Sequence, residues 1–397
     1  MRDPERIERV RRALEEAQLD ALVCALPLHV LLLSGYWPVV GLSLAIATRE
    51  GRIVLLVPED EQELVTLGWA DEVHTFRPAS LSELRSLADV VRQQWQHLAG
   101  HLGLAHARLG FELGPVSEPA SYVAVNLYGS SLEHILRSGA PLSQLSQADE
   151  MLATLAASKT RVEIDRIRHA CRLAATAFES GFAHIKPGLV EAEAASLFRR
   201  PLSANGSNRG ASRADGFVFC MSGENSALAS GAYARSRNRS IRKGDLVLVH
   251  CNSYVDGYWT DITRTYCAGE MDQKKTEIYD AVMHARVAAL SAIKPGVEAR
   301  QVDQAARNVL KARGYEKEFK HSTGHGVGFA AISPNARPQI HPKSHARLLA
   351  GMIFNVEPAV YIDNYGGVRH CDMVAVTDSG YELLTPFHND TEKLVFS

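Results

Sequence analysis

One short phrase that occurs twice does most to constrain the fold of this chain. Ile185–Gly188 has the sequence Ile-Lys-Pro-Gly, and Ile293–Gly296 repeats the same four residues. Lys-Pro-Gly is a common helix stop and can recur by chance. However, a long helical pattern precedes each copy and a second one follows it, so an internal duplication is favoured. Two related halves that face each other would form a cleft between them.

The chain before this duplicated region has a different pattern. Arg6–Gln18 is typical of an amphipathic helix, and Ala21–Leu26 and Arg52–Val57 are short apolar runs between turn signals. Strand and helix signals alternate up to about residue 155. We therefore predict two domains of mixed α/β (α+β) class, a small one over residues 1–155 and a larger one over residues 156–397.

Composition excludes several classes of protein. The 43 basic and 45 acidic residues give a net charge of −2, which makes nucleic acid a poor candidate partner. The most apolar stretch, residues 21–48, is interrupted by prolines and glycines, so no membrane span is expected. The N-terminus has no apolar core of a signal peptide. The six cysteines are dispersed without a Cys-x-x-Cys pair, which fits a reducing cytoplasm.

Five segments are the candidates for chemistry: those around His250 and Asp261, the run His321–Gly328, Asn355–Ala359 and Gly367–Val374. His250 and Asp261 are eleven positions apart with a glycine turn between them, a spacing typical of a hairpin that brings both side chains to one face. The third segment contains glycines, which allow a close backbone approach. The last two place polar residues at or near the ends of apolar runs. Each segment alone is unremarkable, but their order and spacing together are hard to obtain by chance.

These segments contain motifs that resemble the family of Xaa-Pro dipeptidases, aminopeptidases P, methionine aminopeptidases and creatinase. The resemblance runs from about Lys159 to Phe387, and residues 1–155 resemble the N-terminal domain of the prolidase and creatinase branch. It implies a pita-bread catalytic domain with a pseudo-twofold duplication, and a homodimer. The matching phrases are Gly244–Val247, Asp261–Thr265, Gly324–Gly328, Gly351-Met352, Glu357-Pro358 and Tyr361-Ile362.

In this family two divalent metals are held by Asp, Asp, His, Glu and Glu, in that order. Asp261, His325 and Glu357 match the family pattern, whereas His250 replaces the first Asp and Cys371 replaces the last Glu. Losing two carboxylates weakens a site for hard ions such as Mn²⁺, whereas imidazole and thiolate favour zinc. We therefore expect at most one divalent metal, zinc rather than manganese, with Asp261, His325 and Glu357 as its core ligands and with His250 or Cys371 completing its shell.

Two alternatives to this one-metal site stay open. The site can be metal-free. In the second alternative, His250 contacts Cys371 directly and lowers the pKa of the thiol, which makes Cys371 a nucleophile.

The resemblance also implies catalytic roles. His321 matches the position that hydrogen-bonds substrate or transition-state oxygen, Glu357 the proton carrier, and Arg369 an arginine near the last ligand. A histidine that the family carries seven residues after the metal-binding one is Ile332 in this chain. His341 is either its replacement or an ordinary loop residue.

The leading prediction is a metal-dependent Xaa-Pro peptidase of prolidase or aminopeptidase P type, acting on short proline-containing peptides. One alternative is a metal-independent hydrolase resembling creatinase, which would act on a small amide or amidino compound and use His321 for proton transfer. The other is a non-catalytic pseudo-peptidase, because a fold by itself does not confer a function.

Overall fold

The structure is a computed structural model of the chain. It describes residues 2–39, 42–78, 86–113, 129–208, 210–230, 235–333, 336–390 and 394–397. The chain forms two compact units, Met1–Ala156 with Ser333–Asn335, and Ala157–Ile332 with Ala336–Ser397. Both units combine helices with sheets, so the mixed α/β class predicted from the sequence is confirmed. Among the described residues, no helix is long and apolar enough to cross a membrane.

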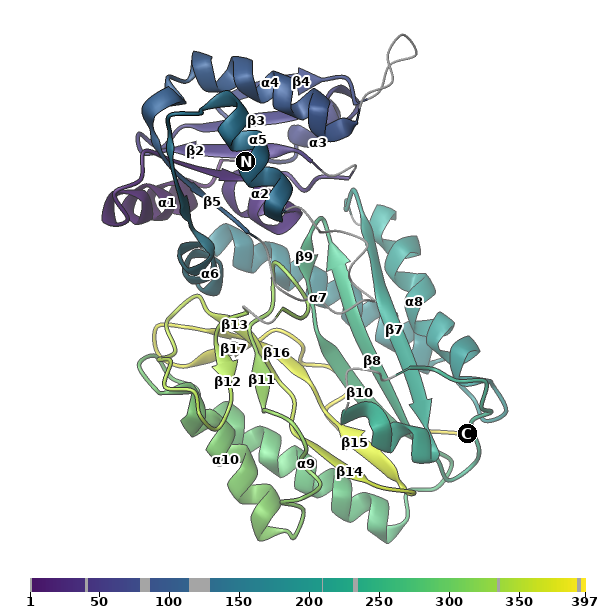
Figure 1. The fold of residues 1–397 in the computed structure, drawn as a ribbon. Helices are drawn as coiled ribbons and strands as arrows, with labels where there is room; N and C mark the ends of the chain where they lie inside the picture. The colour runs from purple at the N-terminus through teal and green to yellow at the C-terminus, as the bar shows by residue number, and fades with distance from the viewer. Residues whose placement is uncertain are drawn as a thin grey trace. The chain divides into compact units, whose positions relative to one another are not determined.

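A six-stranded mixed sheet organises the N-terminal unit (Figure 1), with the strand order β4-β3-β2-β1-β5-β6. The strands are β1 (Ala21–Cys24), β2 (Leu44–Thr48), β3 (Ile53–Pro58), β4 (Glu72–Phe76), β5 (Arg108–Phe111) and β6 (Gln144–Gln147). The helices are α1 (Pro4–Glu16), α2 (Pro27–Ser34), α3 (Gln62–Val65), α4 (Leu87–His101), α5 (Gly129–Gly139) and α6 (Asp149–Ala157), with short 3-10 turns at Glu59–Glu61 and Leu104–His106. The predicted helix and the two predicted strands are α1, β1 and β3.

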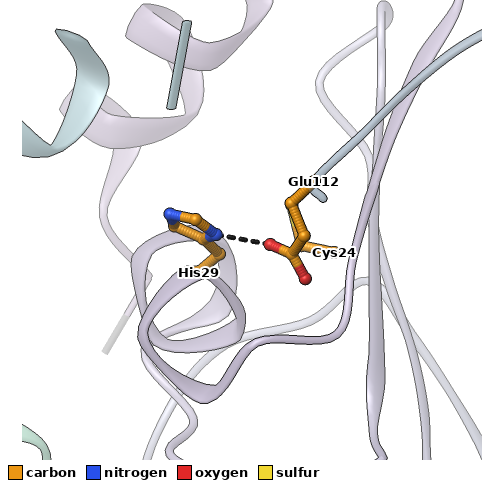
Figure 2. Close-up of side chains that lie close together, drawn as sticks. All are labelled: Cys24, His29 and Glu112. Carbon is orange, nitrogen blue, oxygen red and sulfur yellow. Dashed lines mark hydrogen bonds and ion pairs between the residues drawn. The ribbon is translucent and has the colours of Figure 1, made fainter. Parts of the chain in front are cut away.

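Glu112, which directly follows β5, ties the sheet to the first turn of α2 (Figure 2). One of its carboxylate oxygens accepts the backbone N–H groups of Ala25 and Leu26, and the other contacts His29 Nδ1. The thiol of Cys24 lies within 4.8 Å of this carboxylate. Because α2 has no cap from its own N-cap side chain, Glu112 satisfies N–H groups at its start.

Two helix pairs repeat in the C-terminal unit. They are α7 (Arg161–Phe182) with α8 (Glu191–Asn208), and α9 (Gln273–Ser291) with α10 (Ala299–Ala312). One copy of the Ile-Lys-Pro-Gly phrase joins the helices of each pair. Its last residue has a φ of +93° at Gly188 and +83° at Gly296, a left-handed conformation that glycine adopts without a steric penalty. The two copies therefore share their local conformation, as an internal duplication predicts.

Several small sheets lie between these helix pairs (Figure 1). The first contains β7 (Ala214–Ser222), β8 (Leu246–Val255), β9 (Tyr258–Trp259), β10 (Ile262–Ala268) and β18 (Val395–Phe396). The others are β13 (Ile353–Val356) with β16 (Asp372–Val376) and β17 (Tyr381–Leu383), β14 (Ala359–Ile362) with β15 (Gly366–Arg369), and β11 (Gly324–His325) with β12 (Gln339–Ile340). A 3-10 helix spans Gly223–Ser230. Helices α7 and α8 pack against β7 and β8, whereas α9 packs against β13, β14 and β15.

A buried arginine joins β10 to the segment that leads into β16. Arg264 Nη1 donates to the carbonyl oxygens of Thr263 and Cys371, at 2.9 and 2.7 Å, and its Nη2 donates to Asp372 Oδ1 at 2.7 Å. Arg286 of α9 forms a second ion pair with Asp372. This network fixes the two segments that carry most of the candidate site.

Candidate metal centre

The β8–β10 hairpin brings the first two candidate residues to one face. The chain turns at Asp256-Gly257, which joins β8 to the short strand β9 that leads into β10. Both turn residues have a positive φ, 49° and 87°, as expected for a tight hairpin. The strand register pairs His250 with Thr263. Because strand side chains alternate between faces, Asn252 and Asp261 share that face with them. His250 Nδ1 lies 3.7 Å from Asp261 Oδ1, so the arrangement predicted from the eleven-residue spacing is present.

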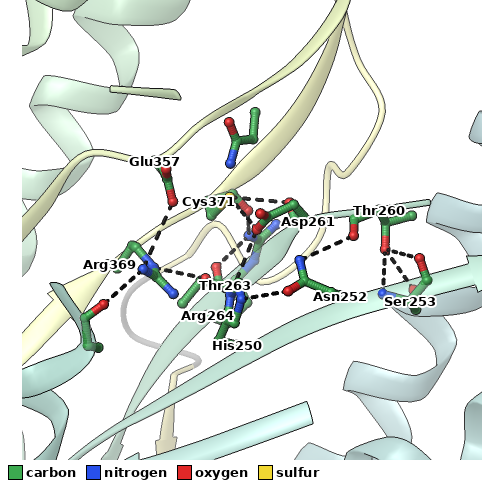
Figure 3. A network of polar contacts seen from close by, with 12 residues as sticks. His250, Asn252, Ser253, Thr260, Asp261, Thr263, Arg264, Glu357, Arg369 and Cys371 are labelled. Atoms are coloured by element: carbon green, nitrogen blue, oxygen red, sulfur yellow. Dashed lines mark hydrogen bonds and ion pairs between the residues drawn. The ribbon is translucent and has the colours of Figure 1, made fainter. Parts of the chain in front are cut away.

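Glu357 and Cys371 approach the same place from the second group of strands (Figure 3). Glu357 directly follows β13 and Cys371 directly precedes β16, and these strands are antiparallel neighbours. A bridge between Cys371 and Thr263 brings this edge against β10. One ligand atom from each of Asp261, Glu357 and Cys371 lies within 4.8 Å of the others, and all three residues are buried.

His325 adds an imidazole beside these three donors. Its Nε2 lies 3.5 Å from Asp261 Oδ2. Its Nδ1 lies 3.2 Å from the carbonyl oxygen of Gly326, an acceptor, so Nδ1 carries the proton and Nε2, which is unprotonated, accepts from the Asn355 side-chain amide at 3.3 Å. Asn355 orients the backbone of His325 by accepting its N–H at 2.7 Å. Such a fixed tautomer is typical of a histidine that binds metal.

His250 differs from His325, because the proton of its ring lies on Nε2. Nε2 lies 3.0 Å from Asn252 Oδ1, which can only accept, so Nε2 donates. Nδ1 lies 3.0 Å from the hydroxyl of Thr263, which in turn accepts a hydrogen bond from Arg369 Nε. Burial lowers the pKa of His250 to about 4, so the ring is neutral. It can bind an ion only if Nδ1 exchanges Thr263 for the metal.

Burial and neighbouring charges also shift the pKa values of the Glu357 carboxyl group and the Cys371 thiol. Burial raises the pKa of Glu357 to about 7, with Asp261 also raising it and Arg369, whose guanidinium lies 4.0 Å away, opposing the shift. Burial, Asp261 and Glu357 hold the pKa of Cys371 well above its usual range. The thiol sulfur lies 3.2 Å from the Asp261 carbonyl oxygen. The alternative in which His250 lowers the pKa of Cys371 is therefore wrong in this geometry.

A second set of polar groups lies beside Glu357. His321 Nδ1 donates to the carbonyl oxygen of Ser322 at 2.8 Å, and its Nε2 lies 2.9 Å from the Tyr361 hydroxyl. Arg369 Nη1 donates to the same hydroxyl at 3.4 Å. Burial and Arg369 lower the pKa of His321 to about 4, so His321 is neutral near pH 7.

His341 follows β12 in an exposed turn, and its Nδ1 accepts the backbone N–H of Lys343. This favours the loop alternative. Sequence reasoning assigned no role to Asn252, Thr263, Asn355 and Tyr361, which orient the candidate residues. Thr263 and Tyr361 lie within phrases that match the family, so their roles could have been inferred from that resemblance.

Comparison with known proteins identifies the class to which this fold and site belong. A model of metallopeptidase family M24 matches residues 165–378, more than half of the chain. A model of the creatinase/prolidase N-terminal domain matches residues 6–124. The chain therefore belongs to metallopeptidase family M24, and it is a peptidase.

Individual relatives match almost the whole chain. An Xaa-Pro dipeptidase from Pyrococcus furiosus is 29% identical over 381 residues, covering 96% of this chain and 97% of that protein. The structure of an Xaa-Pro dipeptidase from Bacillus anthracis has a TM-score of 0.79 at 26% identity, covering 99% of each chain. The prolidase of Pyrococcus horikoshii has a TM-score of 0.77 at 26% identity, covering 98% of this chain and 99% of that chain. The predicted creatinase/prolidase-like and pita-bread architecture is confirmed.

The residues of the site fit a divalent cation. Asp261 and Glu357 are buried carboxylates, and Asp261 raises the pKa of Glu357, so the two repel each other when both are ionised. A cation among them would relieve this repulsion, and the unprotonated Nε2 of His325, 3.5 Å from Asp261 Oδ2, could bind it in place of the Asn355 amide. Metal use, expected from the sequence, is supported by both the family and this donor set.

Proposed function

We propose that this chain is a metal-dependent Xaa-Pro dipeptidase, which hydrolyses the bond before proline in short peptides. The observation that carries the proposal is the convergence of Asp261, Glu357 and Cys371, whose ligand atoms lie within 4.8 Å of one another, with His325 3.5 Å from Asp261. Full-length relatives named Xaa-Pro dipeptidase and prolidase support a dipeptide substrate.

The cofactor that we propose is a single divalent ion, zinc rather than manganese. Asp261, His325 and Glu357 would hold it, and Cys371 would complete the shell; the proximity of these side chains supports this assignment. Imidazole and thiolate ligands are typical of zinc sites. His250 is held by hydrogen bonds to Thr263 and Asn252. Its imidazole also lacks the carboxylate oxygens that a second hard ion would need. When bound, the ion supplies a Lewis acid for the peptide carbonyl and lowers the pKa of a bound water.

The residues around the ion have separate roles. Glu357 is the proposed proton carrier; burial raises its pKa to about 7 in the metal-free site, and a bound ion would lower that pKa. His321 is neutral and acts through hydrogen bonding. Because Nδ1 donates to the Ser322 carbonyl oxygen, Nε2 accepts from the Tyr361 hydroxyl, and donation from Nε2 to a substrate oxygen would require the proton to move from Nδ1 to Nε2. Arg369 positions Thr263 and Tyr361 through hydrogen bonds.

The proposal is tested by metal content and activity together. We expect protein purified without added metal to carry, or to accept, about one equivalent of active-site divalent ion per chain. A chelator should remove cleavage of an Xaa-Pro dipeptide, and Zn²⁺ should restore it better than Mn²⁺. An Xaa-Pro dipeptide should be cleaved faster than an Xaa-Pro-Yaa tripeptide.

Two results would contradict this. Absence of both bound metal and metal-dependent cleavage would remove the proposed function. Activity that survives chelation and disappears in His321→Ala would instead support the metal-independent alternative.

Restoring the family carboxylates should change the metal preference. We expect the double substitution His250→Asp, Cys371→Glu to raise Mn²⁺ affinity by about tenfold or more, because hard oxygen donors suit Mn²⁺ better than imidazole and thiol. Titration of the chelator-treated protein with Mn²⁺ measures the change. Cys371→Ser, which removes the thiol without adding a carboxylate, is the matched control and should show no gain. Unchanged Mn²⁺ affinity in the double variant would mean that these two positions do not face the ion.

A further inference from the structure

Three side chains with metal-binding groups converge in the N-terminal unit. Glu72 and His74 belong to β4, and His101 is the last residue of α4. His74 Nε2 lies 2.6 Å, and His101 Nε2 lies 3.0 Å, from the same carboxylate oxygen, Glu72 Oε1. One ligand atom from each residue lies within 4.8 Å of the others. This cluster belongs to a different unit of the chain from Asp261 and Glu357.

The local fold explains why the three side chains meet. Side chains two residues apart on a strand share a face, so Glu72, His74 and Phe76 point the same way from β4. Phe76 is buried in the core that contains Leu98 of α4, so this face looks toward α4. His101 lies one turn beyond Leu98, where the helix ends. The ligands therefore come from two elements that a shared core already holds together.

The surroundings of the cluster favour a cation. Arg52 Nη2 donates to Glu72 Oε2 at 2.7 Å, which fixes the carboxylate with Oε1 directed at the two imidazoles. His101 lies at the C-terminus of α4, where the helix dipole favours positive charge. The side chains of Glu72, His74 and His101 are 26%, 36% and 60% exposed, so solvent can supply the remaining ligands.

We propose that Glu72, His74 and His101 form a second metal site, which binds Zn²⁺ through two imidazole nitrogens and one carboxylate oxygen. Tetrahedral coordination at zinc places neighbouring ligand atoms roughly 3.3 Å apart. The two nitrogen–oxygen distances, 2.6 and 3.0 Å, need to open by less than about 1 Å to reach that spacing. The ion replaces two hydrogen bonds and links β4, an edge strand of the sheet, to α4.

The cluster of Cys24, His29 and Glu112 is a useful contrast (Figure 2). Its three residues are at most 9% exposed, and Glu112 is already bonded to two backbone N–H groups and to His29. It therefore has a structural role as the cap of α2. The β4–α4 cluster differs because solvent reaches all three of its side chains.

The experiment is a titration of the full chain with ZnCl₂ after chelator treatment, followed by calorimetry and by thermal unfolding. The parent for the comparison is Asp261→Asn, designed to remove the ion of the catalytic site. We expect this parent to bind about one equivalent of Zn²⁺ and to melt at a higher temperature when Zn²⁺ is present. Adding His74→Gln and His101→Gln should weaken this binding by about tenfold or more and remove the shift in melting temperature.

Two further comparisons make the result decisive. His134→Gln, which changes an exposed histidine on α5, should leave Zn²⁺ binding unchanged. In the chain with an intact Asp261, the His74→Gln, His101→Gln variant should keep its peptidase activity, so a failure of this site is distinguishable from a failure of the catalytic one. Equal Zn²⁺ affinity and an equal melting shift with and without the two histidines would overturn the proposal.

Discussion

Asp261→Asn is expected to lower kcat/KM for an Xaa-Pro dipeptide by about 10³-fold or more, which corresponds to ~4 kcal/mol of transition-state stabilisation. The reason is that Asp261 lies at the centre of the proposed ion site, 3.5 Å from His325 Nε2 and within 4.8 Å of the ligand atoms of Glu357 and Cys371. Asparagine has nearly the same shape, but it has no negative charge and only one oxygen donor. Metal content and steady-state kinetics measure the effect.

The same substitution should not weaken the metal-free fold. Asp261 is buried and raises the pKa of Glu357, so replacing its charge removes a repulsion between two buried carboxylates. We expect the metal-free variant to melt at the same temperature as the metal-free wild type, or higher. Asp363→Asn is the control, because Asp363 is exposed and pairs only with Lys320 among the ion pairs described. Full activity in Asp261→Asn, or activity lost because the protein unfolds, would contradict the proposed role.

Asp372→Asn is expected to destabilise the C-terminal unit by about 3–5 kcal/mol, because it leaves buried cations without their counter-charge. Arg264 and Arg286 both form ion pairs with Asp372, and Thr385 donates to it as well. The side chains of Arg264 and Asp372 are fully buried. Urea denaturation followed by circular dichroism measures the loss.

An exposed ion pair supplies the matched control. Glu382→Gln breaks the pair with Arg168, whose side chain is 31% exposed, and should cost less than about 1 kcal/mol. If Asp372→Asn cost no more than Glu382→Gln, the buried network would not be holding β10 against β16.

The pH dependence of Asp372 follows from its charge partners. Burial alone would raise the pKa of Asp372, but Arg264, His370 and Arg286 lower it well below its usual range. A carboxyl whose pKa is lower in the folded state contributes stability above its unfolded value of about 3.9 and loses it as the pH falls toward the folded value. The difference in stability between wild type and Asp372→Asn should therefore shrink as the pH falls below about 4.

Much of the architecture was predictable from local sequence. The repeated Ile-Lys-Pro-Gly phrase indicated the duplication because Gly188 and Gly296 both require a left-handed conformation at the end of a helix. The eleven-position spacing from His250 to Asp261 indicated the hairpin, because an Asp-Gly turn and a strand period of two fix the face of each side chain. These signals depend on neighbouring residues, so they can be found without a structure.

The hydrogen-bond partners of the site were not predictable in the same way. Asn252 and Thr263 hold His250, and Tyr361 faces His321, through contacts that span 2, 13 and 40 positions. Contacts between residues that are far apart in the chain depend on strand register and on the packing of one sheet against another. The elevated pKa of Cys371 was also missed, because it arises from burial beside Asp261 and Glu357.

The five-position site separates most clearly what the sequence determined from what the tertiary structure decided. The sequence by itself determined the family motifs, the retained Asp261, His325 and Glu357, and the two changed positions, because each is a property of residue identity and spacing. Only the tertiary structure decided that His250 is held by hydrogen bonds while Cys371 lies against Asp261. The physical reason is that a donor's chemistry depends on which groups surround it, and those groups come from strands far apart in the chain.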